Sequence, residues 1–385
     1  MGESVFFQIS LIVITCAVLS WGALLLRQPI IVAYLIGGFV CGTSGFGLIH
    51  DTAVIDGISD LGITLLLFLA GIVLHPRRLR ELLRQTLLLT LINSATAILV
   101  CGGFCFLWGF SPVEAFFIGL PFIFSSTILV IKLLPTTALH HKRMGAYCIA
   151  ILIAQDIIAV ALLILIGSRD GSPMQWLLLP VKGIALIAAT FAFEQVILRR
   201  VMARCDRFHE ILQLLALGWC LALALLSHAI GLSHEIGAFI AGVALARSPL
   251  AFFLSEQLKP FRDFFLVFFF FVLGTRFDPS ALQAVALPAL ILCPLMMAAK
   301  YGTFRWLFNR TNEDAPFAHE TGARLAQASE FSLILVMVEY RAGLLSDNGF
   351  QLVQLVTVLS LLISSYLITA RFPSPLASNP KLKQD

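Results

Sequence analysis

Charged side chains are scarce throughout this chain. Asp, Glu, Lys and Arg make up 12% of the 385 residues, whereas hydrophobic residues make up 59% and the mean hydropathy is +0.94. Soluble domains carry about 25% charged residues, because their surfaces must be hydrated. The shortage of charge therefore excludes a soluble globular domain and indicates a polytopic helical membrane protein.

Clusters of reactive side chains are also lacking in the sequence. The eight cysteines are scattered and lie mostly inside apolar segments. Cys101 and Cys105 share a helix face without a His or carboxylate partner, so we interpret them as packing residues rather than metal ligands. No nucleophile–base constellation stands out. We expect no enzymatic activity, no cofactor and no nucleic-acid partner.

Apolar segments of about 20 residues follow one another along the chain. The first, 5–26, is too long for a cleaved signal peptide and is interpreted as a membrane span. The apolar runs between charges and helix breakers predict thirteen spans. They lie near 5–26, 29–49, 57–74, 86–108, 112–134, 144–167, 175–199, 209–230, 233–247, 262–277, 283–308, 317–340 and 351–371.

Basic residues alternate between the predicted loops. The loops around 77–84, 140–143, 199–207 and 305–310 are rich in Lys and Arg, and those between them hold one basic residue or none. The sparse loops contain Arg169, Arg276 and Arg341. The positive-inside rule places the N-terminus outside and the C-terminus in the cytoplasm, in what we expect to be a bacterial inner membrane. An odd number of spans likewise requires the two termini to lie on opposite sides of the membrane.

The thirteen predicted spans divide into six, one and six. This division is typical of an inverted-topology repeat, with repeats at about 5–167 and 209–371 and a linking helix at about 175–199. The membrane domain is expected to occupy 1–372 and a short cytoplasmic tail 373–385. The predicted fold class is therefore an all-α polytopic membrane protein with an inverted 6+6 repeat.

Two spans at matching positions in the two halves contain polar residues near mid-membrane. The span 112–134 holds Pro121, Ser125, Ser126 and Thr127, and the span 317–340 holds Arg324, Gln327, Ser329 and Glu330. Proline frees a backbone carbonyl, and hydroxyls supply replacement partners. Paired discontinuities predict two crossed, broken helices and a transporter binding site. In the alternative interpretation the hydroxyls bond only to their own backbone, and Arg324 and Glu330 form a structural pair.

One carboxylate lies in the middle of an otherwise almost uncharged span. Asp156, preceded by Gln155, is halfway along 144–167. A carboxylate at that depth costs at least about 2.5–3.5 kcal/mol, so it usually relays protons, binds an ion or pairs with a buried cation. Lys300, in the eleventh predicted span, is the expected basic partner. A static salt bridge between Asp156 and Lys300 is the alternative.

Short motifs recur in a characteristic order between about residues 20 and 340. They are Arg27-Gln-Pro-Ile-Ile-Val-Ala-Tyr-Leu35 with Gly37 and Gly38, Leu67-Phe-Leu-Ala-Gly71, Ser125-Ser-Thr127, Ala154-Gln-Asp156, Gly231-Leu-Ser233, Gly237-Ala-Phe239, Ala241-Gly242, Pro260-Phe261, Phe269, Phe270 and Phe271 with Gly274, and Ser329-Glu-Phe331. In this order and spacing the chain resembles the membrane domain of the cation:proton antiporter-2 family, and most closely the Kef-type potassium-efflux antiporters.

The resemblance implies the NhaA-like sodium/proton antiporter fold and a homodimer. It also implies that Asp156 binds the proton and the cation, that Lys300 is the basic partner, and that Gln155 assists together with the hydroxyls of Ser125, Ser126 and Thr127. Val73 stands where the family usually has an acidic residue. The chain also ends before the nucleotide-binding regulatory domain of Kef-type relatives, which leaves a separate cytoplasmic regulatory subunit open.

The predicted function is secondary active exchange of a monovalent cation, K+ or Na+, for H+. Because the proton and the cation compete for Asp156, they must move in opposite directions. A sodium-coupled solute symporter is one alternative, and it would need an anion-recognising arginine such as Arg324. A partner-gated cation channel is another, and it would need a continuous polar face, whereas the polar residues of the sequence look scattered.

Overall fold

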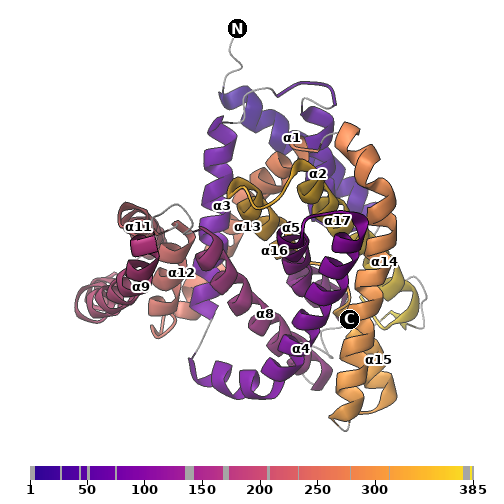
Figure 1. Cartoon of the computed structure of the whole chain (residues 1–385). Coiled ribbons are helices and arrows are strands. Elements are labelled where there is room, and N and C mark those ends of the chain that lie inside the picture. The colour runs from indigo at the N-terminus through magenta and orange to yellow at the C-terminus, as the bar shows by residue number, and fades with distance from the viewer. Residues whose placement is uncertain are drawn as a thin grey trace. The chain divides into compact units, whose positions relative to one another are not determined.

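The computed structural model is helical over nearly all of the chain that it describes, which is residues 5–26, 28–42, 45–49, 53–73, 76–134, 143–167, 173–205, 209–232, 234–277, 279–311, 313–375 and 382–383. Predictions that rest on Arg27, 140–142, Arg169, Arg207, Ser233 and most of 373–385 lie outside these residues. The helices (Figure 1) are α1 (Val5–Leu25), α2 (Ile30–Cys41), α3 (Ala53–Val73), α4 (Pro76–Trp108), α5 (Pro112–Gly119), η1 (Leu120–Ile123), α6 (Thr127–Leu133), α8 (Arg143–Gly167), α9 (Pro173–Phe193), η2 (Glu194–Leu198), α10 (Arg199–Arg204), α11 (His209–Ala229), α12 (His234–Leu245), α13 (Ala251–Thr275), α14 (Pro279–Arg310), α15 (Ala315–Arg324), α16 (Glu330–Arg341) and α17 (Asp347–Arg371).

Seven helical runs in the described part of the chain are long and apolar enough to cross a membrane. They are Val5–Leu25, Ile55–Ile72, Thr86–Trp108, Arg143–Leu163, His209–Ala229, Gln283–Arg310 and Asp347–Arg371. Three shorter apolar runs, Ile30–Cys41, Pro112–Ile123 and His234–Leu245, also coincide with predicted spans. The all-helical fold class is confirmed, and the total of thirteen spans stays a prediction.

Two helices begin well before the spans predicted for them. α4 starts at Pro76 rather than near 86, and α13 starts at Ala251 rather than near 262. The predicted basic loop 77–84 therefore lies within α4. Apolar runs end where charge begins, but Leu, Arg, Glu and Gln are all good helix formers and proline suits a first helical turn. The helix consequently extends beyond its apolar part.

The chain divides into two compact units. Unit 1 contains residues 1–50, 81–159 and 273–385, and unit 2 contains 51–80 and 160–272. The predicted repeats, 5–167 and 209–371, follow a different division, and they stay a prediction.

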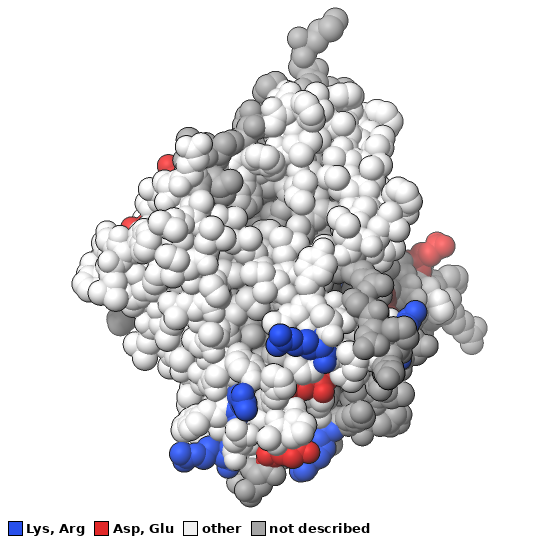
Figure 2. All heavy atoms as spheres, turned by 90° about the vertical axis from the view of Figure 1, so that its right-hand side faces the viewer, with Lys and Arg blue, Asp and Glu red and all other residues white. Residues whose placement is uncertain are grey.

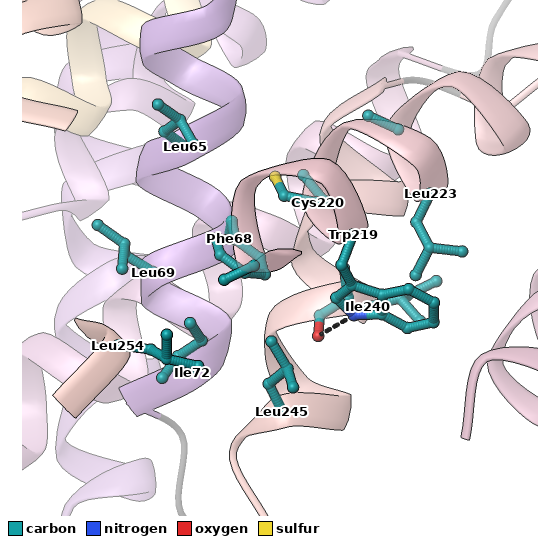
Figure 3. Close-up of a cluster of buried hydrophobic side chains, with 14 of the residues drawn as sticks. Leu65, Phe68, Leu69, Ile72, Trp219, Cys220, Leu223, Ile240, Leu245 and Leu254 are labelled. Carbon is teal, nitrogen blue, oxygen red and sulfur yellow. Dashed lines mark hydrogen bonds between the residues drawn. The ribbon is translucent and has the colours of Figure 1, made fainter. Parts of the chain in front are cut away.

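Unit 2 is built around a close contact between α3 and α12. A Cβ on Gly71 would lie 2.6 Å from the carbonyl oxygen of Phe239, and one on Gly242 would overlap the carbonyl oxygen of Phe68. Small residues let membrane helices approach this closely, which explains the glycines of the two motifs. Beside the contact, Trp219 of α11 donates a hydrogen bond from Nε1 to Ala241 O at 3.2 Å (Figure 3).

The same unit contains a cluster of buried apolar side chains, and the members labelled in Figure 3 come from four helices. The labelled members are Leu65, Phe68, Leu69 and Ile72 of α3, Trp219, Cys220 and Leu223 of α11, Ile240 and Leu245 of α12, and Leu254 of α13. The α3–α12 contact lies within this cluster, to which both helices contribute.

Unit 1 contains both segments that the sequence predicted to be interrupted. Within it α14 packs along α17 and α15, and α16 turns back onto α17 (Figure 1). The end of α13 belongs to this unit, and a Cβ on Gly274 would overlap the carbonyl oxygen of Leu35 in α2. Figure 2 shows one face of the molecule, on which the Lys and Arg side chains gather in the lower part and much of the remaining surface is uncharged.

Candidate functional site

The first interrupted segment is α5, η1 and α6. Ser111 begins it as an N-cap, accepting a hydrogen bond from Glu114 N at 3.2 Å. The chain tightens into the 3₁₀ turn η1 at Pro121 and becomes extended at Phe124, whose φ and ψ are −83° and 150°. Ser126 then caps α6 by accepting a hydrogen bond from Leu129 N at 3.1 Å. The predicted hydroxyls therefore lie at a break in the helix.

The second interrupted segment is α15 and α16, joined by residues 325–329. α15 ends at Arg324, and Ser329 caps α16 by accepting a hydrogen bond from Phe331 N at 3.1 Å. Ser332 completes a capping box, because its side chain accepts a hydrogen bond from Ser329 N, also at 3.1 Å. Gln327 lies inside this second break.

Side chains from each segment bond to backbone carbonyls of the other. Ser125 Oγ donates to Leu325 O at 2.7 Å, and Ser332 Oγ donates to Pro121 O at 2.6 Å. The rings of Phe124 and Phe331 lie 6.4 Å apart. The interruptions free carbonyls inside an apolar unit, and the hydroxyls satisfy two of them.

Lys300 of α14 joins both breaks through its ammonium group. Lys300 is fully buried, and its Nζ donates to Phe124 O at 2.5 Å and to Gln327 O at 2.9 Å. Asn93 of α4 supports this helix by donating from Nδ2 to Lys300 O at 3.0 Å. Lys300 and Asp156 are both described, and no ion pair joins them. The ammonium therefore binds backbone carbonyls in this structure.

Gln155 of α8 connects Asp156 to the first break. Its Oε1 accepts a hydrogen bond from Ser125 N at 2.9 Å, and its Nε2 lies 3.4 Å from Ser125 Oγ. Asp156 is half-buried and forms no hydrogen bond or ion pair with any residue that the structure describes. Glu330, a buried acidic residue at the start of α16, is near enough to interact with it electrostatically. A partly accessible carboxylate thus directly follows Gln155, the residue that is hydrogen-bonded to the first break.

The other predicted site residues divide into three kinds of position. Thr127 Oγ1 and Gln327 Nε2 are buried and have no hydrogen-bond partner among the described residues. Ser126 and Ser329 are helix caps. Arg324, the last residue of α15, donates to Leu133 O at 2.9 Å, to Pro373 O at 2.6 Å and to Glu320 Oε1 at 2.7 Å.

Sequence reasoning missed a row of buried polar side chains on α17 and a buried acid on α16. Gln351, Gln354, Thr357, Ser360 and Ser364 are all at most 4% exposed, and Glu339 is fully buried. The five α17 residues recur at intervals of three or four, so each is a neighbour of the next on the helix surface. That spacing was the signal in the sequence. Glu339 gave none, because it lies near the end of an apolar run.

Comparisons with known proteins agree with this arrangement. The family described as "Sodium/hydrogen exchanger, transmembrane" matches residues 10–371. The iron transporter MagA of Paramagnetospirillum magneticum is 30% identical over 371 residues, which are 94% of this chain and 84% of MagA. The putative K(+) efflux antiporter KefB of Alkalimonas amylolytica is 29% identical over 88% of this chain. This chain spans 52% of the length of that protein, or about half.

A solved structure resembles the whole fold. The sodium proton antiporter MjNhaP1 from Methanocaldococcus jannaschii has a TM-score of 0.68, with 14% sequence identity over 94% of this chain and 96% of its own. At that identity the likeness establishes the fold alone. The family match covers nearly the entire chain and confirms the membership that the sequence motifs predicted. The chain belongs to the sodium/hydrogen exchanger family, whose members are multi-pass membrane transporters and not enzymes.

Proposed function

We propose that this chain exchanges a monovalent cation, K+ or Na+, for H+ across the membrane, and that both bind at Asp156. The observation that carries the proposal is the position of this carboxylate. It is half-buried and unpaired among the described residues, and it follows Gln155, which holds the first break through Ser125. A carboxylate in a membrane helix without a structural partner needs another ligand to offset its desolvation.

The chemistry follows from the single negative charge. Ionised Asp156 can hold a dehydrated cation with help from neighbouring oxygens, and protonated Asp156 cannot. Because the two forms exclude each other, each crossing of the site carries either a cation or a proton. The exchange needs no cofactor. Alternating exposure of such a site is consistent with the paired interruptions of the inverted repeat that we propose for this fold.

The names of two relatives indicate different cations. KefB is named a putative K(+) efflux antiporter, and MagA is named an iron transporter. The site contains one unpaired carboxylate, with hydroxyl and amide groups around the breaks, and no group of three or more His, Cys, Asp or Glu residues that could hold a metal occurs in the described part of the chain. Oxygen ligands, without a cluster of imidazole or carboxylate groups among the described residues, favour an alkali cation over Fe²⁺.

The symporter alternative loses its expected anion-binding group. Arg324 would have to face a solute carboxylate, but its Nε and both terminal nitrogens donate to Glu320, Leu133 O and Pro373 O. An arginine whose donors are engaged in this way is a structural link between α15, the end of α6 and the segment after α17. We therefore propose exchange rather than anion symport.

Proteoliposomes containing a pH-sensitive dye test the proposal. Addition of KCl or NaCl should move protons in the wild type, and addition of FeSO₄ or of a sodium salt of an organic anion should not exceed the signal of empty vesicles. Asp156→Asn keeps the size of the side chain but cannot ionise, so exchange should fall to the empty-vesicle signal. Asp263→Asn is the matched control, because Asp263 is 55% exposed and pairs with Arg262. Wild-type exchange in Asp156→Asn vesicles would overturn the proposal.

A further inference from the structure

Buried polar side chains form a row along α17. Gln351, Gln354, Thr357, Ser360 and Ser364 follow one another in this polar row, since residues three and four apart are neighbours on a helix surface. At 3.6 residues per turn, the row winds about half way round the helix between Gln351 and Ser360. From the first to the last the row is about 20 Å long, at about 1.5 Å per residue. It therefore extends through much of the thickness of an apolar bilayer core, which is about 30 Å.

One end of this row reaches the second break. Ser360 Oγ accepts a hydrogen bond from Ala328 N at 3.1 Å and donates to Thr357 O at 2.8 Å. Ser364 Oγ donates to Gln327 Oε1 at 3.2 Å. This end of the polar row is thus connected by hydrogen bonds to the same backbone segment that Lys300 binds.

The other half of the row has acceptors that the described residues leave unused. The amide nitrogens are fixed, with Gln351 Nε2 donating to Arg276 O at 2.6 Å and Gln354 Nε2 to Leu273 O at 3.3 Å. Gln351 Oε1, Gln354 Oε1 and Thr357 Oγ1 are buried without a described partner. Buried acceptors of this kind cost about 1–3 kcal/mol each unless water satisfies them.

Glu339 adds a carboxyl group near the same end of α17. It is fully buried, and neither of its carboxylate oxygens has a partner among the described residues. The adjacent Tyr340 stacks on Phe350 with ring centroids 4.5 Å apart, and its hydroxyl donates to Asp347 Oδ1 at 2.7 Å. The end of α16 that carries Glu339 therefore lies on the first turn of α17.

We propose that Glu339 and the polar row of α17 form a hydrated proton path from the Asp347 end of α17 to the second break, with Glu339 as a protonation site distinct from Asp156. The proposal rests on the proposed exchange function. Glu339 accepts a proton from one water molecule and returns it to another, so no bond of the protein chain forms or breaks. Because no described residue binds its carboxyl group, the proton can enter and leave without breaking a contact of the fold.

Water access can be measured without any transport assay. Gln354→Cys and Thr357→Cys, made separately in the full chain, should react with a charged, membrane-impermeant methanethiosulfonate reagent in vesicles, read as an added mass. Such reagents need water at the thiol. Ile363→Cys is the matched control on the same helix, because Ile363 is 44% exposed on the apolar outer surface. Ile363→Cys should gain no more mass than the wild type, which contains only the native cysteines. No added mass at either 354 or 357 would overturn the path.

The role of Glu339 is tested by Glu339→Gln, which keeps the shape of the side chain but cannot carry a proton. Its exchange rate should fall well below that of the wild type and of Asp263→Asn, at an unchanged elution volume on size exclusion. Exchange equal to the wild type would remove Glu339 from the path. If wild-type vesicles show no exchange at all, the proposed function fails, and the cysteine labelling still decides whether a hydrated path exists.

Discussion

Lys300 and Asp156 were predicted as a pair, and each has different neighbours in the structure. The ammonium of Lys300 donates to Phe124 O and Gln327 O, which are carbonyls that the two interruptions leave outside regular helix. Hydrogen bonds to a charged group contribute about 1.5–3 kcal/mol each. Lys300 is therefore expected to stabilise both breaks, whatever charge Asp156 carries.

This role predicts a loss of stability in Lys300→Met. The thioether side chain fills similar space but leaves both carbonyls buried without a donor, so the midpoint of thermal unfolding in detergent should fall markedly. Lys259→Met is the matched control, because Lys259 is exposed and its loss should leave the midpoint unchanged. An unchanged midpoint in Lys300→Met would show that the two hydrogen bonds do not stabilise the fold.

Single residues show what the sequence could reveal about the site. Asp156 was found because a carboxylate in mid-span is costly, and Lys300 for the same reason. The partners of Lys300 could not be found, since they are backbone carbonyls and every residue has one. Ser126 was predicted to serve the site and is an N-cap, a role that depends on where α6 begins. Glu339 could not be found from the sequence, because only the structure shows that it is buried.

At the scale of helices, α3 and α12 depend on two glycines. The carbonyl oxygens of Phe68 and Phe239 occupy the positions where side chains on Gly242 and Gly71 would begin. Gly242→Ala should therefore lower the free energy of unfolding, by about 1–3 kcal/mol for one overpacked methyl group. Thermal unfolding in detergent measures this change.

The control for this variant lies in α11 of the same unit. A Cβ added to Gly218 would meet no atom within 4 Å, so Gly218→Ala should be neutral or should stabilise the helix by about 0.5–1 kcal/mol. If both variants destabilised the protein equally, close packing would not explain the glycine motif. The sequence predicted that these glycines belong to shared motifs, but only the contact shows that they face each other.

At the scale of the whole molecule, unit 1 separates its charged residues between two ends. Arg143 at the start of α8 pairs with Glu313 at 3.5 Å, beside the end of α14 at Arg310, so these residues share one end. The other end holds Arg276, whose carbonyl accepts a hydrogen bond from Gln351 in the first turns of α17. The predicted basic and sparse loops of unit 1 are thus at opposite ends of its helices.

The positive-inside rule then fixes an orientation that can be measured. α17 starts at the Arg276 end. It has 25 residues and a length of about 37 Å, so it reaches the Arg310 end. The end rich in arginine should be cytoplasmic, since basic loops are retained on that side. Green fluorescent protein fused after Asp385 should therefore fluoresce in bacterial cells, because it folds in the cytoplasm. Alkaline phosphatase at the same position should be inactive. The reverse pattern would invert the molecule, and the proposed hydrated path along α17 would then open towards the cytoplasm.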